Sequence, residues 1–307
     1  MEKKKGLEFL ADKLFDVEHA LNMHASSFFY LPAAGIYEPE MLAPHADLIS
    51  KCHIYVIGFV PRINFVNAAQ KDRDLILSFE ALGQNYDLTW ELPPDFTLHH
   101  EDGLWYVGDG TGQRFFPNEY SWLKGLQQRY GIAKFLVKYI GQAFGKDGSR
   151  NALDRLTKHE TLQKISLLGA PEGYRLELVL LQVEPDNQLI TMFNPWAENK
   201  EKGSERIKRG LDKLFNTTEK ERVALYEAAL IRYFQPEFNI EFKDSFPSTN
   251  LKVLQDCYDK DLAAVSAEIV LDELPVTLYS EVVKPSDTHF ALYDLHSDEA
   301  RRVFFAK

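Results

Sequence analysis

The pattern of apolar and polar positions divides the chain into predicted helices and strands. Apolar residues at 6–24 are interrupted by charged residues such as Glu8, Asp12 and Asp16, which predicts an amphipathic helix. Short apolar runs bounded by Pro, Gly and Asn are typical of strands, and they follow at 54–60, 75–79, 86–92 and 104–107. We therefore expect a helix and then a strand-rich region over the first part of the chain.

The middle of the chain alternates helices with strands. Apolar periodicity predicts a helix at 120–131 and strands at 132–140 and 174–183, the last mostly apolar and therefore central. Asn151, with Asp154 three residues later, is placed to cap a helix that continues to about Ser166.

The part after residue 183 begins with a polar, charged stretch, 184–203, which is predicted to be a loop. Thr218 and Glu221 form a Thr-x-x-Glu capping box, which predicts a helix through about Phe234. The remaining elements are a predicted helix near 249–260 and predicted strands at 264–271, 275–283 and 289–295.

Charge is distributed unevenly along a chain whose net charge is −11. Residues 1–113 carry about −9, residues 114–160 carry +5, residues 161–240 carry −1 and residues 241–307 carry −6. Because phosphate contacts need a basic surface, the overall charge argues against a protein that coats nucleic acid. The basic middle segment instead predicts a local site for a polyanion. The acidic segments on both sides are predicted to face something other than the polyanion.

Composition narrows the class of protein further. The chain has no run of about 18–20 apolar residues, so we expect no membrane span and a cytoplasmic location. Its two cysteines, Cys52 and Cys257, lie far apart without a zinc-like spacing and are predicted to be ordinary thiols.

Glu227 interrupts the apolar side of the helix predicted at 218–234. The apolar stripe consists of Val223, Leu230, Ile231 and Phe234, and Glu227 falls on the same face. A buried carboxylate is costly unless it has a cation, a hydrogen-bond partner or a metal. The pattern therefore indicates a metal ligand, and the alternative is a glutamate at the edge of the stripe that pairs with Lys220 or Arg222 in solvent.

Two further clusters carry polar chemistry. Arg155 and His159 are spaced i, i+4 and are predicted to project from one side of a helix, where they could bind a phosphate and move a proton. Tyr139 ends the strand predicted at 132–140, and its phenolate would be favoured beside an arginine and a divalent cation.

Taken in order, these residues resemble the GIY-YIG nuclease superfamily over about 100 residues. The resemblance rests on Tyr139-Ile140-Gly141, on Arg155-Leu156 followed by His159, and on a closing block that runs from Glu227 through Leu230-Ile231 and Pro236 to Asn239. The closing block is the most specific part, because its Glu, Leu-Ile, Pro and Asn have the spacing seen in excision-repair and homing members.

The resemblance implies an α+β fold with a small mixed β-sheet flanked by helices, and hydrolysis of a phosphodiester by water. It implies Mg²⁺ or Mn²⁺ held by Glu227, Tyr139 as general base or as the group that orients the water, and Arg155 stabilising the charged phosphorane. His159 would support proton transfer, and Asn239 would brace the site.

The first tyrosine strand of the family has no counterpart where it is expected, roughly ten residues before Tyr139. The best candidate is Tyr106 in the run 104–108, if residues 109–131 are an insertion, and Tyr130 is the second. The literal Gly35-Ile36-Tyr37 is interpreted as a coincidence. A long loop at 145–150 also makes Arg150 a competitor of Arg155, and the Arg-Leu-x-x-His register favours Arg155.

These features predict three regions and two classes of function. The regions are a helix and strand-rich domain at 1–115, a GIY-YIG-like nuclease domain at 116–240 and a small acidic α/β extension at 241–307. The leading hypothesis is a metal-dependent endonuclease acting on nucleic acid, DNA rather than RNA, with a role in defence by analogy. The alternative is a weakly active or inactive nucleic-acid-binding or sensor subunit of a larger assembly. In either case the acidic ends are candidate surfaces for a homodimer or a protein partner.

Overall fold

The centre of the protein is a five-stranded sheet assembled from distant parts of the chain. The computed structural model describes residues 16–145, 148–185, 188–194, 203–247, 251–296, 301 and 303–305. The strand order is β14-β10-β3-β11-β2. Adjacent strands from β10 to β2 run antiparallel, and β14 is parallel to β10. The bounds are β2 (Ser27–Pro32), β3 (Ile54–Pro61), β10 (Lys134–Gln142), β11 (Tyr174–Gln182) and β14 (Thr277–Tyr279).

All eight residues of β3 are buried, because this strand lies in the middle of the sheet and both of its faces are covered. A strand that is covered on both faces has a continuous apolar sequence, and for this reason the strand at 54–60 was predicted correctly. The predicted strands at 132–140 and 174–183 are confirmed as β10 and β11, and β11 is an interior strand as expected.

A second sheet contains the first and the last strand of the described chain. It has the order β12-β1-β13-β15, formed by β1 (Asp16–Ala25), β12 (Gln188–Asn194), β13 (Ala264–Val270) and β15 (Thr288–Asp294). The prediction of a helix at 6–24 is wrong from Asp16 onward, and residues 6–15 lie outside the described residues. Between β12 and β13, β1 is buried on both faces from Val17 to Asn22, so apolar and polar positions do not alternate and the strand pattern is hidden.

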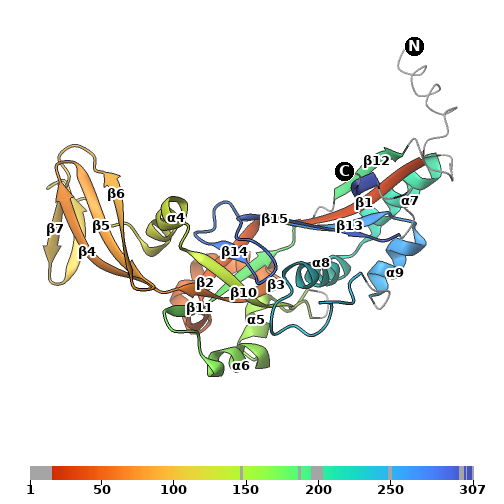
Figure 1. The fold of residues 1–307 in the computed structure, drawn as a ribbon, viewed down its shortest axis with the longest axis horizontal. Coiled ribbons are helices and arrows are strands. Elements are labelled where there is room, and N and C mark those ends of the chain that lie inside the picture. Colours follow the sequence, from red (N-terminus) through yellow and green to blue (C-terminus); the bar gives the residue numbers. More distant parts are fainter. Residues whose placement is uncertain are drawn as a thin grey trace, which may run out of the picture.

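An arm of paired strands, residues 63–116, is inserted between the neighbouring strands β3 and β10. It contains one sheet of order β4-β5-β6 and another of order β7-β8-β9. Figure 1 shows it at one end of an elongated molecule, with the second sheet at the other end. Its strands are β4 (Ile63–Lys71), β5 (Asp74–Ala81), β6 (Gln84–Glu91), β7 (Thr97–Glu101), β8 (Leu104–Gly108) and β9 (Arg114–Phe115). The strands predicted at 75–79, 86–92 and 104–107 are confirmed.

Helices connect and cover the two larger sheets. After β2 come η1 (Ala33–Tyr37), α2 (Pro39–Leu42), η2 (Ala43–His45) and α3 (Ala46–Lys51), and α4 (Glu119–Tyr130) follows the arm. The later helices are α5 (Ala152–Leu156), α6 (Glu160–Leu168), α7 (Gly203–Asn216), α8 (Glu219–Phe234), α9 (Lys252–Asp259) and η4 (Val303–Phe305). Helix α8 lies between the sheets and contacts β10, β13 and β15 (Figure 1).

The caps predicted from the sequence are present, but two spans differ. Asn151 and Thr218 form reciprocal capping boxes with Asp154 and Glu221. The helix predicted from Asn151 to Ser166 is instead two short helices, α5 and α6, with a turn at 157–159. The prediction of a loop over all of 184–203 is wrong at 188–194, where the mostly apolar edge strand β12 lies, and α7 was not predicted.

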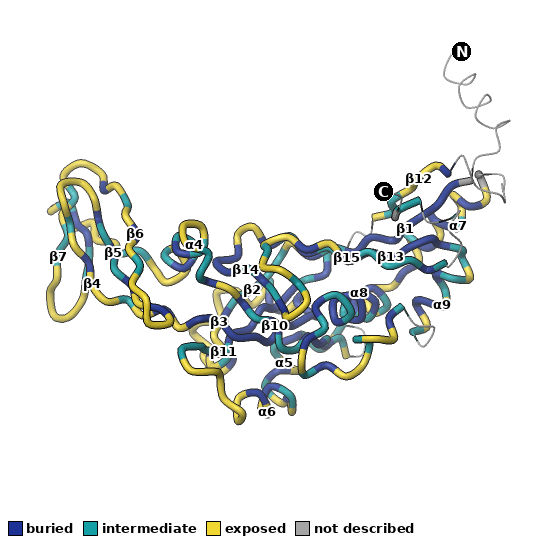
Figure 2. The backbone as a smooth tube through the Cα atoms, viewed as in Figure 1, coloured by how far each residue is buried: buried dark blue, intermediate teal, exposed yellow. Residues whose placement is uncertain are grey.

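Two groups of buried side chains hold the fold together, one on each face of the central sheet. The larger group also includes the inner faces of the arm, α8 and the second sheet, and the smaller group lies beneath η1, α3, α5 and α6. Figure 2 shows burial concentrated in the central strands and α8, and exposure along the arm and α6.

The mixed α+β class is confirmed. The sheets cross the predicted boundaries near 115 and 240, because β3 pairs with β10 and β1 pairs with β13. No described helix is long and apolar enough to span a membrane.

Candidate functional site

Two tyrosines meet on adjacent antiparallel strands of the central sheet. Tyr139 lies on β10 beside a register shift, and Tyr55 lies on β3 opposite Gly141. Their rings are stacked with centroids 6.2 Å apart. A side chain at position 141 would place its Cβ 2.5 Å from the Tyr55 ring, so glycine is required there for the Tyr55 ring to lie across β10.

His159 joins the two tyrosines from the turn between α5 and α6. Its Nδ1 accepts the backbone N–H of Leu162 (3.2 Å), and its Nε2 lies 3.0 Å from the Tyr55 hydroxyl. Because a backbone N–H can only donate, Nδ1 carries no proton and Nε2 donates to the Tyr55 oxygen. Burial, together with the positive charges of Arg155 and Arg150, lowers the pKa of His159 to about 4. His159 is therefore a neutral hydrogen-bond donor to Tyr55 at physiological pH.

Arg155 reaches the same cluster from the last turn of α5. The prediction that Arg155 and His159 project from one continuous helix is wrong, because His159 is the N-cap of α6. The turn nevertheless brings both side chains to Tyr55, because His159 contacts its hydroxyl and Arg155 lies close enough to lower its pKa. Arg155 is exposed, so its guanidinium is available to a ligand.

The tyrosines are phenols in this structure. Burial raises the pKa of Tyr55 and of Tyr139, and Arg155 opposes the rise without overcoming it. The negative charge of Glu227 raises the pKa of both groups as well. The expectation that an adjacent arginine favours the phenolate of Tyr139 is correct in direction, but burial outweighs it while no cation balances Glu227.

Glu227 approaches Tyr139 from α8. The apolar stripe predicted for this helix is confirmed, since Val223, Leu230, Ile231 and Phe234 are buried. Burial raises the pKa of Glu227 and interactions with the side chain and backbone of Gln142 oppose the rise, so that the pKa is about 7. The side chain is half-buried, so its carboxylate lies where the core meets the surface.

Asn239 holds β10 in place rather than facing the tyrosines. Its Oδ1 accepts the backbone N–H of Ile140 (2.9 Å), and its Nδ2 donates to the carbonyl of the same residue (2.8 Å). The backbone N–H of Phe238 donates to the carbonyl of Lys138. The chain after α8 is thereby fixed along the strand between Tyr139 and Gly141, which is the bracing role expected of Asn239.

The candidates for a first tyrosine were wrong. Tyr106 lies on β8, which pairs with β7 and β9 in the arm, whereas β10 pairs with β3 and β14. The Tyr106 ring stacks on His99. Tyr130 ends α4 and donates to the carbonyl of Asp87. The residue beside Tyr139 is Tyr55, and its signal in the sequence is a single tyrosine in the apolar run 54–60.

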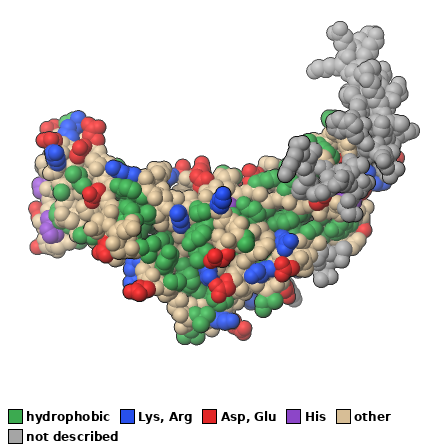
Figure 3. Space-filling view, in the orientation of Figure 1, with side chains coloured by type: hydrophobic (Ala, Val, Ile, Leu, Met, Phe, Trp, Pro, Cys, Tyr) green, Lys and Arg blue, Asp and Glu red, His purple; other side chains and the backbone are tan. Residues whose placement is uncertain are grey.

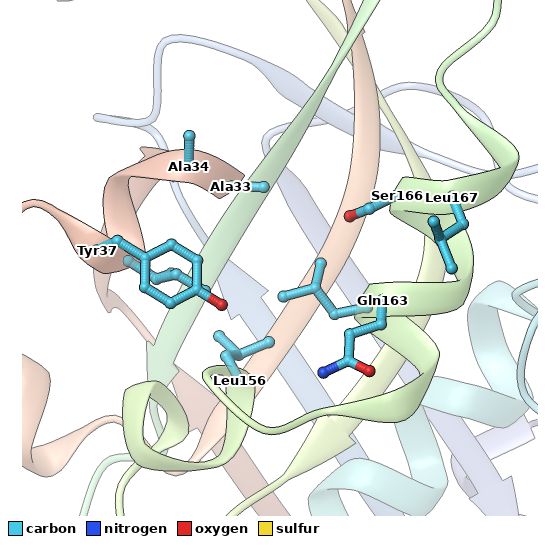
Figure 4. A pocket seen from close by; sticks show the side chains of 9 residues that line it. Ala33, Ala34, Tyr37, Leu156, Gln163, Ser166 and Leu167 are labelled. Carbon is cyan, nitrogen blue, oxygen red and sulfur yellow. The ribbon is translucent and has the colours of Figure 1, made fainter.

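Two other positions are clarified by the geometry. The charge of Arg150 acts on His159, whereas the charge of Arg155 acts on His159, Tyr55, Tyr139 and Glu227, so the structure favours Arg155 over Arg150. Tyr37 of the literal Gly-Ile-Tyr lies in η1 and is 67% exposed. It lines a mostly apolar pocket of 530 Å³ between η1 and α6, whose lining does not include the tyrosine cluster (Figure 4).

The surface around the cluster has mixed charge. Arg155, Lys158 and Lys164 are exposed near it, and Lys164 lies 5.7 Å from the centre of the Phe238 ring. Lys138 forms an ion pair with Glu237. Figure 3 shows basic and acidic side chains interspersed over the middle of the visible face, without one continuous basic surface. A polyanion would therefore be bound locally rather than along an extended track.

Glu227 is the carboxylate that the cluster offers to a cation, and Glu241 lies close enough for its charge to raise the pKa of Glu227. Among the described residues there is no group of three or more His, Cys, Asp or Glu side chains able to hold a metal ion. Mg²⁺ commonly keeps several waters and binds through one or two carboxylates together with substrate phosphates. The donor set therefore fits a weakly held Mg²⁺ that is completed by water and a bound phosphate, and it does not fit a preformed structural metal site.

Comparison with known proteins adds no relative. No protein-family model matches the chain, and neither the curated proteins nor the solved structures contain a match.

Proposed function

We propose that this protein is a metal-dependent endonuclease of the GIY-YIG type that hydrolyses phosphodiester bonds in nucleic acid, with DNA as the expected substrate. One observation carries the proposal. Tyr55, Tyr139 and His159 are in contact, and Arg155 and Glu227 lie close enough to change the pKa of both tyrosines. The order of the chain, with two antiparallel tyrosine strands, the Arg155 and His159 segment, strand β11 and then α8, also agrees with the resemblance.

Each group in the cluster suits one part of phosphodiester hydrolysis. The exposed guanidinium of Arg155 can accept a phosphate in a bidentate manner and stabilise the charge that develops in the transition state. Glu227 would hold Mg²⁺ or Mn²⁺, which when bound stabilises charge on the phosphate and favours ionisation of the attacking water.

The hydrogen bonds assign the tyrosines a role that depends on Glu227. His159 donates to the Tyr55 oxygen and has no free lone pair on either ring nitrogen, so it stabilises a phenolate at Tyr55 rather than accepting its proton. The charge of Glu227 opposes that phenolate. Neutralising Glu227 with a cation would therefore lower the pKa of both tyrosines and allow one of them to orient the water or take its proton.

A plasmid nicking assay tests the proposal. Wild-type protein with Mg²⁺ or Mn²⁺ should relax supercoiled plasmid, and Glu227→Ala should lower the rate by at least about 100-fold, as expected for loss of a metal ligand or an acid-base group. Glu237→Ala is the matched control, because Glu237 is an exposed glutamate ten residues away on the segment that follows α8. Equal loss of plasmid with wild type and Glu227→Ala would refute the proposal.

A binding module without turnover is the second candidate, and the raised pKa values of both tyrosines favour it if no cation binds at Glu227. It predicts that oligonucleotides bind to wild type and to Glu227→Ala with the same affinity and that neither protein cuts. Arg155→Ala should weaken binding under both hypotheses. Fluorescence anisotropy with labelled DNA and RNA of one sequence, beside the nicking assay, separates the two functions and identifies the preferred nucleic acid.

A further inference from the structure

The pocket between η1 and α6 lies beside the candidate site. Its volume of 530 Å³ is within the range of sites that bind small molecules or parts of larger ones. Its lining is mostly apolar with a few polar groups, and Tyr37 and Gln163 stand on opposite sides of it (Figure 4). The proposed hydrolysis uses none of the side chains that line this pocket.

One turn of the chain connects the pocket to the tyrosine cluster. The Nε2 of His159 lies 3.0 Å from the Tyr55 hydroxyl, and its Nδ1 accepts the backbone N–H of Leu162, whose side chain lines the pocket. Arg155 directly precedes Leu156, which also lines the pocket. Because consecutive Cα atoms are only about 3.8 Å apart, a nucleic acid whose phosphate binds Arg155 passes within one or two nucleotides of the pocket.

The lining of the pocket suits a nucleobase. Tyr37 presents an aromatic ring that is 67% exposed, on which a base can stack. The buried side chains of Leu156 and Leu162 form an apolar wall. Gln163 carries an amide donor beside an amide acceptor, the pair that matches the edge of adenine, and Ser166 adds a hydroxyl. A purely apolar ligand would leave these polar groups unused.

The charges on the two sides of the pocket differ in sign. The segment that contains α5 and α6, residues 151–168, carries +1, and Arg155 and Lys158 are exposed on it. Residues 33–42, on the side of Tyr37, carry −2 from the exposed Glu38 and Glu40. A phosphate is therefore favoured at Arg155, and the part of the ligand that faces Tyr37 should be uncharged, as a base is.

We propose that this pocket holds one unpaired nucleobase of the substrate, with adenine preferred, while a neighbouring phosphate binds Arg155. The inference rests on the proposed endonuclease function and adds the class of substrate, which is nucleic acid with a base outside the duplex stack. A base in an intact duplex must be unpaired and unstacked before it can enter a pocket at the side, and this costs free energy. Single strands, bulges and flipped nucleotides should therefore bind more tightly than a perfect duplex.

Binding to three labelled DNA duplexes without divalent cations tests the proposal by fluorescence anisotropy. The duplexes share one sequence and differ at one position, which is fully paired, carries an extra unpaired adenine or carries an extra abasic nucleotide. Wild type should bind the unpaired adenine about 10-fold more tightly than either of the others, as expected for one base stacked on an aromatic ring. Equal affinity for the unpaired adenine and the abasic nucleotide, or no binding to any duplex, would overturn the proposal.

Substitutions in the pocket show where the base binds. Tyr37→Ala should bind all three duplexes equally, whereas Tyr37→Phe, which keeps the ring, should retain the wild-type preference. Because Tyr37 is exposed, its loss should leave the melting temperature nearly unchanged. Tyr130→Ala is the matched control, since Tyr130 is a partly exposed tyrosine on α4 outside the pocket, and this variant should keep the preference. A preference that survives Tyr37→Ala places the base elsewhere and overturns the proposal.

The role of Gln163 is tested by changing the base. Wild type should bind an unpaired adenine about 10-fold more tightly than an unpaired thymine, and Gln163→Leu should remove this difference. A difference that remains in Gln163→Leu would refute recognition of the base by Gln163.

These binding measurements are separate from cleavage. Wild type that nicks plasmid, but binds the unpaired adenine no better than the abasic nucleotide, keeps the endonuclease function and loses the base pocket. Wild type that prefers the unpaired adenine, but does not nick, keeps the base pocket and loses the endonuclease function.

Discussion

Replacing Glu227 by glutamine should make the protein more stable while removing its proposed activity. Glutamine keeps the size of the side chain and can still accept a hydrogen bond from Gln142, which in the structure bonds to Glu227. What the substitution removes is a charge that the surrounding core disfavours. The expected effect on stability follows from the pKa of about 7 at Glu227, compared with about 4.5 for an ordinary glutamate.

The sign and the pH range follow from proton binding. Because the folded state holds the Glu227 proton more tightly than the unfolded state, the free energy of unfolding falls as pH rises from about 4.5 to about 7 and then stays low. The full difference corresponds to about 3 kcal/mol, and partial exposure of the side chain reduces it to about 1–2 kcal/mol. Glu227→Gln removes this penalty, so its advantage should be absent near pH 4.5 and complete above pH 7.

Thermal unfolding followed by circular dichroism measures this advantage. At pH 8.5 without divalent cations, Glu227→Gln should melt roughly 2–6 °C above wild type, and at pH 4.5 the two should coincide. Glu237→Gln controls for the change in net charge. Adding Mg²⁺ at pH 8.5 should raise the melting temperature of wild type and leave Glu227→Gln unchanged, because a cation needs the ionised carboxylate. Parallel pH curves for wild type and Glu227→Gln would show that the core does not disfavour this charge.

Three further substitutions examine other contacts. Gly141→Ala places a methyl group 2.5 Å from the Tyr55 ring, so it should cost about 1–3 kcal/mol in urea unfolding and abolish nicking; full activity would contradict the close packing. Asn239→Ala removes two hydrogen bonds to the backbone of β10 and should speed amide exchange in that strand, at a cost of about 1–3 kcal/mol; unchanged exchange would deny its bracing role. Arg301→Ala removes two hydrogen bonds from the fully buried carboxylate of Glu18, so the free energy of unfolding should be about 3 kcal/mol lower than in wild type. Equal urea midpoints for Arg301→Ala and wild type would contradict this.

Local signals in the sequence identified much of the candidate site. The Thr218 capping box positions the start of α8, and the apolar stripe then places Glu227 at the edge of the core, where the structure has it. The resemblance implied that Asn239 braces the site, and its side chain makes two hydrogen bonds to the backbone of Ile140 beside Tyr139. These predictions succeeded because capping, helical periodicity and turns depend on residues within a few positions of one another.

Tyr55 could not be found in the same way, because its contact with Tyr139 is made across strands. The arm and α4 separate β3 from β10 in the sequence, although the two strands are neighbours in the sheet. Proximity to Tyr139 in the sequence therefore does not lead to Tyr55, although the strand that holds Tyr55 was predicted correctly. Register between strands is determined by long-range packing, and the sequence carries no local sign of it.

The same limit explains the errors at β1 and α7. Apolar periodicity indicates which residues share one face of a helix or strand. It does not indicate whether that face meets the core or solvent. β1 is covered on both faces, so its pattern resembled a helix, and α7 places its apolar side in solvent because Arg206 and Lys213 bind carboxylates on the body of the protein. If charged residues set the orientation of α7, then the Arg206→Met and Lys213→Met pair should allow the helix to turn its apolar side inward. That variant would keep α7 folded in a turned orientation, whereas Leu211→Glu would keep α7 in its present orientation. Alkylation of a cysteine introduced at Leu211, which should slow only where the helix has turned its apolar side inward, distinguishes the two orientations, because the native cysteines are buried.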